Sequence, residues 1–244
     1  MIPGNVRSIN DSNNNNNNAP NCKEYIQKAW EKLPLYIRIM IILSLSLYLL
    51  SFLAQPLIIA LVNIPHNTVY KFRFWTLYTS IYVNLSIFNI VFAFMSWIPS
   101  AIVQENQSGT IKYMFNIFMH SSLIQILYTI LAIMMTLKDP SSGLWPLLMA
   151  EITLNSCENP ERDVMMMFIP YPFKAKYYPW ALLGFFAVMN QFNIQYDTVI
   201  GILYGYLYFY YLKNYLVISD NFLTKVDNCI PFKYLKRFTG KYFK

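Results

Sequence analysis

Long apolar stretches without a single charged residue dominate this chain, and short polar segments separate them. Four of these stretches reach or exceed the roughly 20 residues that a helix needs to cross a bilayer; they are residues 39–70, 74–104, 113–137 and 177–196. Two shorter apolar stretches are residues 143–156, interrupted by Glu151, and residues 198–212, followed by Lys213. Because lipid-exposed backbone must be hydrogen-bonded within its own segment, we expect both to be helices shielded by neighbours. The pattern predicts an all-α membrane protein with six transmembrane helices.

Composition and charge agree with this prediction. Hydrophobic residues make up 56% of the chain and charged residues 13%, whereas a soluble domain carries about 25% charged residues. If both termini are cytoplasmic, sixteen of the nineteen Lys and Arg residues lie on the cytoplasmic side, as the positive-inside rule asks, and only Lys71, Arg73 and Lys138 lie opposite. This asymmetry explains most of the net charge of +7 without nucleic acid as a partner.

Polar regions flank the apolar part of the chain. Residues 1–35 include the homopolymer Asn13–Asn18, and we expect residues 1 to about 22 to be disordered. The tail, residues 217–244, interleaves basic and aromatic residues, which predicts contact with anionic membrane lipids. The three cysteines have no zinc or disulfide spacing, and we expect no metal and no cofactor. Cys157 and Cys229 lie near predicted membrane boundaries, where they are either palmitoylated or inert.

Three motifs resemble the frame of rhomboid intramembrane proteases. In Phe74–Ser80 the Trp-Arg-x-x-Thr opening has kept Trp75 and its Thr, but Thr76 stands where the Arg belongs. The segment from Glu105 through Gly109 to Thr110 resembles the Glu-x-x-x-Gly-Ser turn after the second helix, and Gly201 and Gly205 resemble the Gly-x-x-x-Gly of the last helix. The resemblance covers about residues 36–216 and implies a rhomboid-like bundle of six transmembrane helices.

The catalytic positions of that family are altered here. The resemblance places the serine nucleophile in Gly-x-Ser-Gly on the fourth helix, and the nearest match is Ser142, in Pro-Ser-Ser-Gly. Ser142 is either a remnant of the nucleophile or an ordinary helix cap. The general base should stand three residues before Gly201, where this chain has Thr198. His66 falls in the first loop and His120 in the third helix, so we expect neither to act as the base on the last helix.

Polar and bulky residues within the apolar stretches are candidates for binding. Asn84 and Asn89 match the oxyanion positions of the second helix, and each is either a hydrogen-bond donor there or a structural link between helices. Glu151 in the fourth helix is costly in lipid and therefore expected to face inward, as a client-binding group or as a helix-to-helix bond. With Trp145 and Trp180, these residues are predicted to shape an entrance between the second and fifth helices.

The start of the predicted fifth helix adds a second resemblance. The sequence from Tyr177 through Pro179 to Trp180 is similar to the Tyr-x-Pro-Trp of Derlins, and Phe238–Gly240 to the core of the motif by which Derlins recruit a cytosolic unfoldase ATPase. The resemblance implies a pseudoprotease of the endoplasmic reticulum that recognises transmembrane or misfolded clients for quality control or degradation. Two alternatives stay open: a divergent intramembrane serine protease using Ser142, and a lipid-interacting scaffold without clients.

Overall fold

The computed structural model describes residue 27 and residues 30–166, 169–189 and 195–213 of the chain. Three predictions lie outside these residues: disorder before residue 22, the lipid or ATPase contacts of the tail 217–244, and the modification of Cys229. Residues 34–213 belong to one compact unit, and residues 27–33 to another. In the unit that contains residues 27–33, the side chain of Gln27 donates a hydrogen bond to Glu31.

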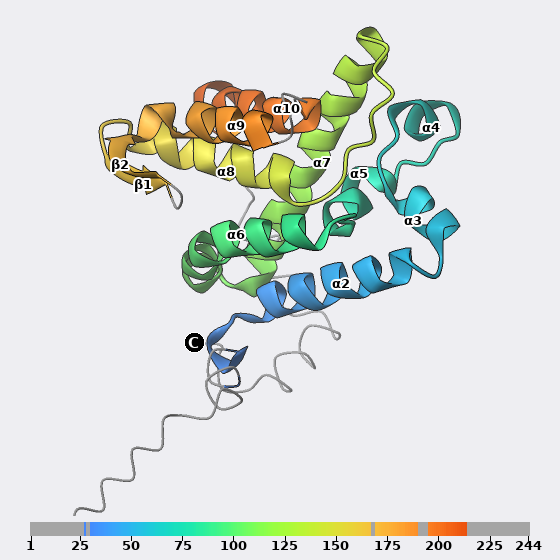
Figure 1. Ribbon diagram of the computed structural model, residues 1–244, viewed down its shortest axis with the longest axis horizontal. Helices are drawn as coiled ribbons and strands as arrows, with labels where there is room; N and C mark the ends of the chain where they lie inside the picture. Colours follow the sequence, from blue (N-terminus) through green and yellow to red (C-terminus); the bar gives the residue numbers. More distant parts are fainter. Residues whose placement is uncertain (1–26, 28–29, 167–168, 190–194, 214–244) are drawn as a thin grey trace, which may run out of the picture. The chain divides into compact units, whose positions relative to one another are not determined.

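The larger unit is mostly helical (Figure 1). Its long helices are α2 (Leu35–Ser51), α6 (Ile87–Ser108), α7 (Thr110–Met134), α8 (Trp145–Glu158), α9 (Tyr178–Met189) and α10 (Tyr196–Leu207). Short helices fill the first loop, namely α3 (Gln55–Leu61), α4 (Pro65–Tyr70), α5 (Thr76–Thr79) and the 3-10 turn η1 (Ser80–Tyr82). A 3-10 turn, η2 (Ala175–Tyr177), leads into α9, and a π turn, η3 (Tyr208–Leu212), continues α10.

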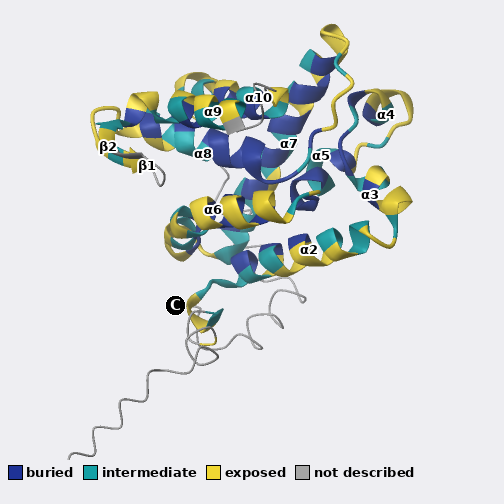
Figure 2. Cartoon of the chain, viewed as in Figure 1, coloured by how far each residue is buried: buried dark blue, intermediate teal, exposed yellow. Residues whose placement is uncertain are grey.

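Two layers of helices share α7 (Figure 1). Helices α8, α9 and α10 pack together in one layer, α2 lies against α6 in the other, and α7 contacts both. Helix α8 is the centre of the unit, because every residue from Trp145 to Ala150 is buried (Figure 2). The first six residues of α8 are apolar all round and must be covered on all sides, and α8 is contacted by α6, α7, α9 and α10.

Two helices are long and apolar enough to cross a membrane, α6 with 22 residues and α7 with 25. Helix α2 is apolar but has 17 residues. One span was predicted within residues 39–70; in that stretch α2 ends at Ser51, and Pro56 and Pro65 lie in the first turns of two short helices, α3 and α4. Helices α8, α9 and α10 have 14, 12 and 12 residues. The full set of six spans therefore stays a prediction.

The described part of the protein is mostly helical, as predicted, with one addition: β1 (Asp163–Met166) and β2 (Ile169–Lys174) form an antiparallel hairpin between α8 and α9. One expectation about the elements was wrong. Asn84, expected within the second helix, lies in the extended segment before α6, which begins at Ile87.

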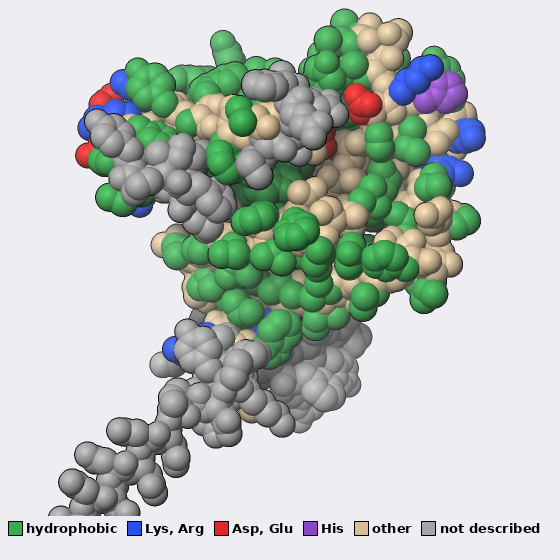
Figure 3. Space-filling view, in the orientation of Figure 1, with side chains coloured by type: hydrophobic (Ala, Val, Ile, Leu, Met, Phe, Trp, Pro, Cys, Tyr) green, Lys and Arg blue, Asp and Glu red, His purple; other side chains and the backbone are tan. Residues whose placement is uncertain are grey.

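The surface fits a protein surrounded by lipid. Large hydrophobic side chains are exposed along α2 and α6, including Leu49, Phe88 and Met95, and Figure 3 shows apolar side chains covering this layer. Most charged side chains in that view gather at the hairpin end and at the α4 end, with the apolar surface between them. Exposed apolar areas of this extent are unusual in soluble monomers.

Candidate functional site

The turn between α7 and α8 is held on both sides of Ser142. Ser141 forms a backbone bridge with Asn63 of the first loop, with N–O distances of 3.2 and 2.9 Å. Gly143 has a φ of +89°, and its N–H donates to the carbonyl of Ser80 at 2.9 Å. A Cβ on Gly143 would stand 2.5 Å from Asn84 Oδ1, so only glycine fits beside this amide. The position of Ser142 is thereby determined by its two neighbours.

Ser142 is not a helix cap. Helix α8 begins at Trp145, its N-cap residue is Leu144, and no side chain bonds to its first turn. The Ser142 side chain instead lines a cavity of about 300 Å³. Of the two interpretations of Ser142, the ordinary helix cap is therefore wrong. Ser142 lies at the edge of a polar cavity.

Polar groups from four segments line this cavity. The amides of Asn84, Asn89 and Gln195, the carboxylates of Asp139 and Asp197, and the hydroxyls of Ser142 and Tyr128 all contribute, together with Trp145. Asn84 is only 5% exposed, and its side chain has no hydrogen-bond partner among the residues that the structure describes. The amide of Asn84 is not among the fully buried side-chain groups that lack a partner, so it is open to the cavity and can bond to a polar occupant.

A chain of hydrogen bonds fixes the carboxylate of Asp197. Its Oδ2 accepts from Ser141 Oγ at 3.0 Å, and Ser141 Oγ in turn accepts from Gln125 Nε2 at 2.9 Å. Gln125 Oε1 accepts from Asn63 Nδ2 at 2.7 Å, which links the first loop to α7 and α10. Sequence reasoning missed Asn63, Gln125 and Ser141, because each is an ordinary polar residue and the bonded partners are far apart along the chain.

Thr198, which the sequence resemblance matches with the family's histidine, interacts with the same carboxylate. Its backbone N–H donates to Asp197 Oδ1 at 2.7 Å, and its hydroxyl lies 3.3 Å from that oxygen. The Thr198 hydroxyl therefore donates a hydrogen bond to this carboxylate. Asp197 lies in the first turn of α10, whose N-cap residue is Gln195.

Both histidines of the chain lie outside this cavity. His120 Nδ1 is 2.8 Å from Tyr204 Oη of α10, and its ring packs edge-on against Tyr208. His66 in α4 packs against Tyr70, with ring centroids 4.6 Å apart. His120 is thus a hydrogen-bonded residue between α7 and α10.

The structure brings together three of the five predicted binding residues. Asn84, Asn89 and Trp145 line the cavity, and Trp145 also packs edge-on against Phe186 of α9. Trp180 does not line it; its indole N–H donates to Tyr206 Oη of α10 at 3.1 Å.

Glu151 is also absent from the cavity lining. Its Oε2 is buried and accepts no hydrogen bond from the described residues. Glu151 and Trp180 were grouped with the cavity because sequence position does not show which face of a helix meets which neighbour.

The residues of the Trp-x-x-x-Thr motif hold the first loop together. The indole N–H of Trp75 donates to the carbonyl of Ala60 at 2.9 Å, and Thr79 Oγ1 donates to the carbonyl of Leu61, also at 2.9 Å. These carbonyls belong to the last residues of α3, which lack partners within the helix. Thr76, in place of the family's arginine, has its Oγ1 3.0 Å from Thr68 Oγ1. The motif therefore positions the loop that carries Asn63.

Glu105 and Gly109 organise the opposite end of the unit. Glu105 Oε1 accepts from the backbone N–H of Tyr36 in the first turn of α2 at 3.0 Å and from Thr110 Oγ1 at 2.8 Å. A carboxylate is favourable at a helix N-terminus because of the free N–H groups and the helix dipole. Gly109, with a φ of +84°, separates α6 from α7, as expected for a tight turn.

Gly201 and Gly205 are the points where α10 crosses α8. A Cβ on Gly201 would lie 2.2 Å from the carbonyl oxygen of Pro146, and one on Gly205 would lie 2.7 Å from Thr153 Cβ. The Gly-x-x-x-Gly motif therefore allows the two backbones to approach closely, as its spacing predicts. Through this contact Asp197, one turn before Gly201, is brought to the start of α8.

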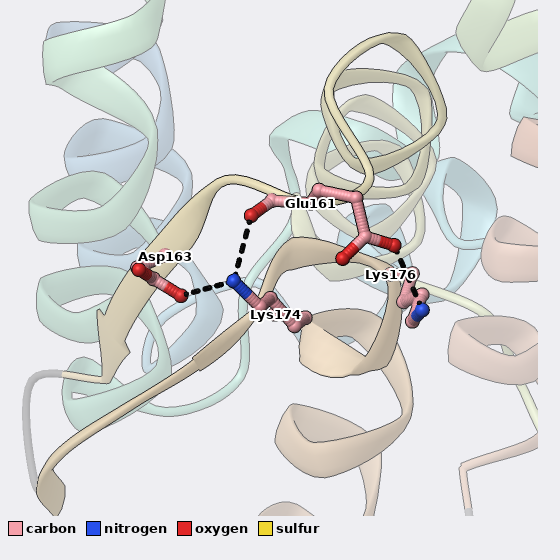
Figure 4. Close-up of polar contacts among 4 residues, drawn as sticks. All are labelled: Glu161, Asp163, Lys174 and Lys176. Atoms are coloured by element: carbon pink, nitrogen blue, oxygen red, sulfur yellow. Dashed lines mark hydrogen bonds and ion pairs between the residues drawn. The ribbon is translucent and has the colours of Figure 1, made fainter.

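Ion pairs stabilise the base of the β-hairpin (Figure 4). Lys174 Nζ lies 3.0 Å from Asp163 Oδ1, and the register places these two residues opposite each other. Lys176 Nζ lies 2.9 Å from Glu161 Oε1. The hydrogen bond and the charge of Lys176 lower the pKa of Glu161, and the same carboxylate raises the pKa of Lys176. All four side chains are exposed, so these pairs contribute little free energy.

Comparison with known proteins agrees with the three motifs. The family model described as "Rhomboid domain" matches residues 71–215, which is more than half of the chain. Rhomboid-like protein 15 of Arabidopsis thaliana is 21% identical over 216 residues, which cover 82% of this chain and 52% of that protein. The chain thus spans about half the length of this relative. From the family match and the geometry of its motifs, the chain belongs to the rhomboid family.

Proposed function

We propose that this rhomboid-like protein has no protease activity and binds transmembrane or misfolded client proteins. The observation that carries the proposal is the composition of the cavity at Ser142, which neither histidine lines. A serine hydroxyl is a poor nucleophile without a base to take its proton. The residue at the position of the base, Thr198, donates to Asp197 instead. Without the base, only weak residual catalysis would remain.

A serine-directed fluorophosphonate tests this part of the proposal. The full chain, purified in detergent, is expected to show no labelling above that of Ser142→Ala, while an active rhomboid protease labels under the same conditions. Ser141→Ala serves as a matched control, since Ser141 is the neighbouring serine but its hydroxyl is already bonded on both sides. Labelling of the wild type that Ser142→Ala abolishes and Ser141→Ala retains would establish a reactive serine.

One observation favours the protease as the second candidate. The Ser142 hydroxyl lines the cavity and has no hydrogen-bond partner among the described residues, and the carboxylates of Asp139 and Asp197 line the same cavity. A divergent protease would need one of these groups to act as its base. The labelling experiment decides between the two candidates directly.

Client binding is supported by where the cavity lies. It is lined by Leu85 and Asn89 at the start of α6 and by Trp145, which contacts α9. We propose that clients enter between α6 and α9, the second and fifth of the expected spans. Photoreactive residues in place of Asn89 and Trp180 should then capture membrane clients, and one in place of Phe118 on α7, which is 41% exposed, should not. Equal capture at the three positions would instead favour general lipid or protein contact, as for a scaffold.

The membrane arrangement that we propose has six spans and both termini in the cytoplasm, in the endoplasmic reticulum. Its support is the charge asymmetry of the sequence together with the separation of charged side chains to two ends of the unit (Figure 3). Glycosylation acceptors placed within Asn13–Asn18 or after Lys244 should stay unmodified in cells. Efficient modification at either site would reverse the orientation. We further propose that the tail 217–244 contacts membrane lipids or the cytosolic unfoldase ATPase.

A further inference from the structure

We propose that the cavity at Ser142 receives a basic side chain, lysine or arginine, of a client helix. This inference rests on the proposed client binding and specifies the chemistry of the client. It starts from the charge of the cavity wall. Asp139 and Asp197 contribute two carboxylates, and no Lys, Arg or His is among the described residues that line the cavity. Lys138 is exposed, precedes Asp139 and does not line the cavity.

The acceptor groups are positioned in advance. The Asp197 carboxylate is held by Ser141 Oγ on one oxygen and by the N–H of Thr198 on the other. A carboxylate offers about four lone-pair sites, so it can accept further bonds from an ammonium or guanidinium group. The amide of Asn84, a residue that is 5% exposed, and the hydroxyl of Ser142 also line the cavity and lack partners among the described residues. Charge-assisted bonds to such fixed acceptors are stronger than bonds between neutral groups.

The size and the aromatic wall point to the same kind of occupant. A volume of about 300 Å³ corresponds to roughly ten waters and is at the small end of ligand pockets, which suits one long side chain better than a larger molecule. Tyr128, Trp145 and Tyr196 also line the cavity, and aromatic faces attract cations. A lysine or arginine within a membrane helix is costly in hydrocarbon, so a client helix that carries one gains most from this cavity.

Capture of matched reporter helices tests the inference. The full chain carries a photoreactive residue in place of Leu85, which lines the cavity and is 61% exposed. It is reconstituted in phosphatidylglycerol nanodiscs with single-span poly-leucine helices that contain one Lys, one Leu or one Glu near either end. We expect the lysine helix to be captured about tenfold more than the leucine helix, a ratio that corresponds to about 1.4 kcal/mol. The glutamate helix should be captured no more than the leucine helix.

Variants assign the preference to the two carboxylates. Asp139→Asn should lower the lysine-to-leucine ratio to about threefold or less, and Asp139 is an exposed residue whose change leaves the bonds of Asp197 in place. Asp197→Asn should act in the same direction. Glu161→Gln, on the hairpin, removes one carboxylate away from the cavity and should keep the tenfold preference. A melting curve for each variant shows whether it is folded.

The outcomes separate this inference from the proposed function. Equal capture of lysine and leucine helices at position 85 would overturn the charge preference and leave client binding intact. No capture of any helix at position 85 would overturn both. A lysine preference that disappears when phosphatidylethanolamine replaces phosphatidylglycerol would assign the cavity to a lipid ammonium group, which also overturns the inference.

Discussion

Gly201→Ala should separate α10 from α8 and unfold the protein more easily. The added methyl group would stand 2.2 Å from the carbonyl oxygen of Pro146 and 3.0 Å from its carbonyl carbon. Both atoms belong to the backbone of α8, so no side-chain rotation relieves the contact. Ordinary contact begins at 3.4 Å, and the helices would have to move apart by roughly 1 Å in a packed core that resists such changes.

The expected loss of stability is the difference between the cost of overpacking and the gain in helix propensity. Overpacking a core costs about 1–3 kcal/mol, and contact with backbone places this change near 3. Replacing a helical glycine by alanine returns about 1 kcal/mol, so we expect a net loss of about 2 kcal/mol. For a chain of this size that lowers the melting temperature by about 4–8 °C. The lysine preference of the cavity should fall as well, because Asp197 lies one turn before Gly201 on α10.

Gly184→Ala on α9 is the matched control. No atom lies within 4 Å of the Cβ that would be added there, so only the gain in helix propensity remains, about 1 kcal/mol. Thermal unfolding in one detergent, followed by circular dichroism, compares both variants with the wild type. The reasoning fails if Gly201→Ala melts at or above the wild-type temperature, as Gly184→Ala is expected to do.

Two further predictions concern the other end of the unit. Glu105→Ala removes the acceptor for the N–H of Tyr36 and should cost about 1–2 kcal/mol in thermal unfolding, with a smaller loss for Glu105→Gln; equal melting of all three proteins would exclude this capping role. The Glu161–Lys176 pair should stabilise the hairpin weakly and only within a pH window. Because the pKa of Glu161 is lowered and that of Lys176 raised, the contribution is present above about pH 4.3 and below about pH 10.4. It is lost as pH falls through the lowered pKa of Glu161 or rises through the raised pKa of Lys176. Melting curves of Lys176→Gln and the wild type should therefore differ slightly at pH 7 and coincide at pH 2, and a difference that grows at pH 2 would contradict the assignment.

The motifs with backbone consequences were predictable from the sequence. Gly109 turns the chain at a positive φ, and Gly201 lets α10 approach α8. Both roles depend on the absence of a Cβ, and glycine is recognised directly in the sequence. The breaks in the first apolar stretch at Pro56 and Pro65 were also visible as residues, but hydrophobicity alone joined the segments into one span.

The polar network could not be predicted, because its members have no distinctive spacing. Ser141 and Asp197 are 56 positions apart, and Asn63 and Gln125 are 62 apart. Any Asn, Gln or Ser in the apolar stretches was an equally good candidate for such a bond. Only the packing of the first loop against α7 and of α10 against α8 selects these four. The same limitation explains why Trp180, which bonds to Tyr206, was grouped with the cavity.

The network also explains how the cavity keeps its shape. Thr76, at the arginine position, contacts Thr68, and Thr68 Oγ1 donates to Asn63 Oδ1 at 2.7 Å. Asn63 then connects through Gln125 and Ser141 to Asp197. A buried polar network is stabilising only when each of its polar groups has a hydrogen-bond partner. In this network each residue is bonded to the next, and the last bond, from Ser141, positions the Asp197 carboxylate. The bonds from Ser141 and Thr198 hold this carboxylate in one position, which the proposed binding of a basic client side chain requires.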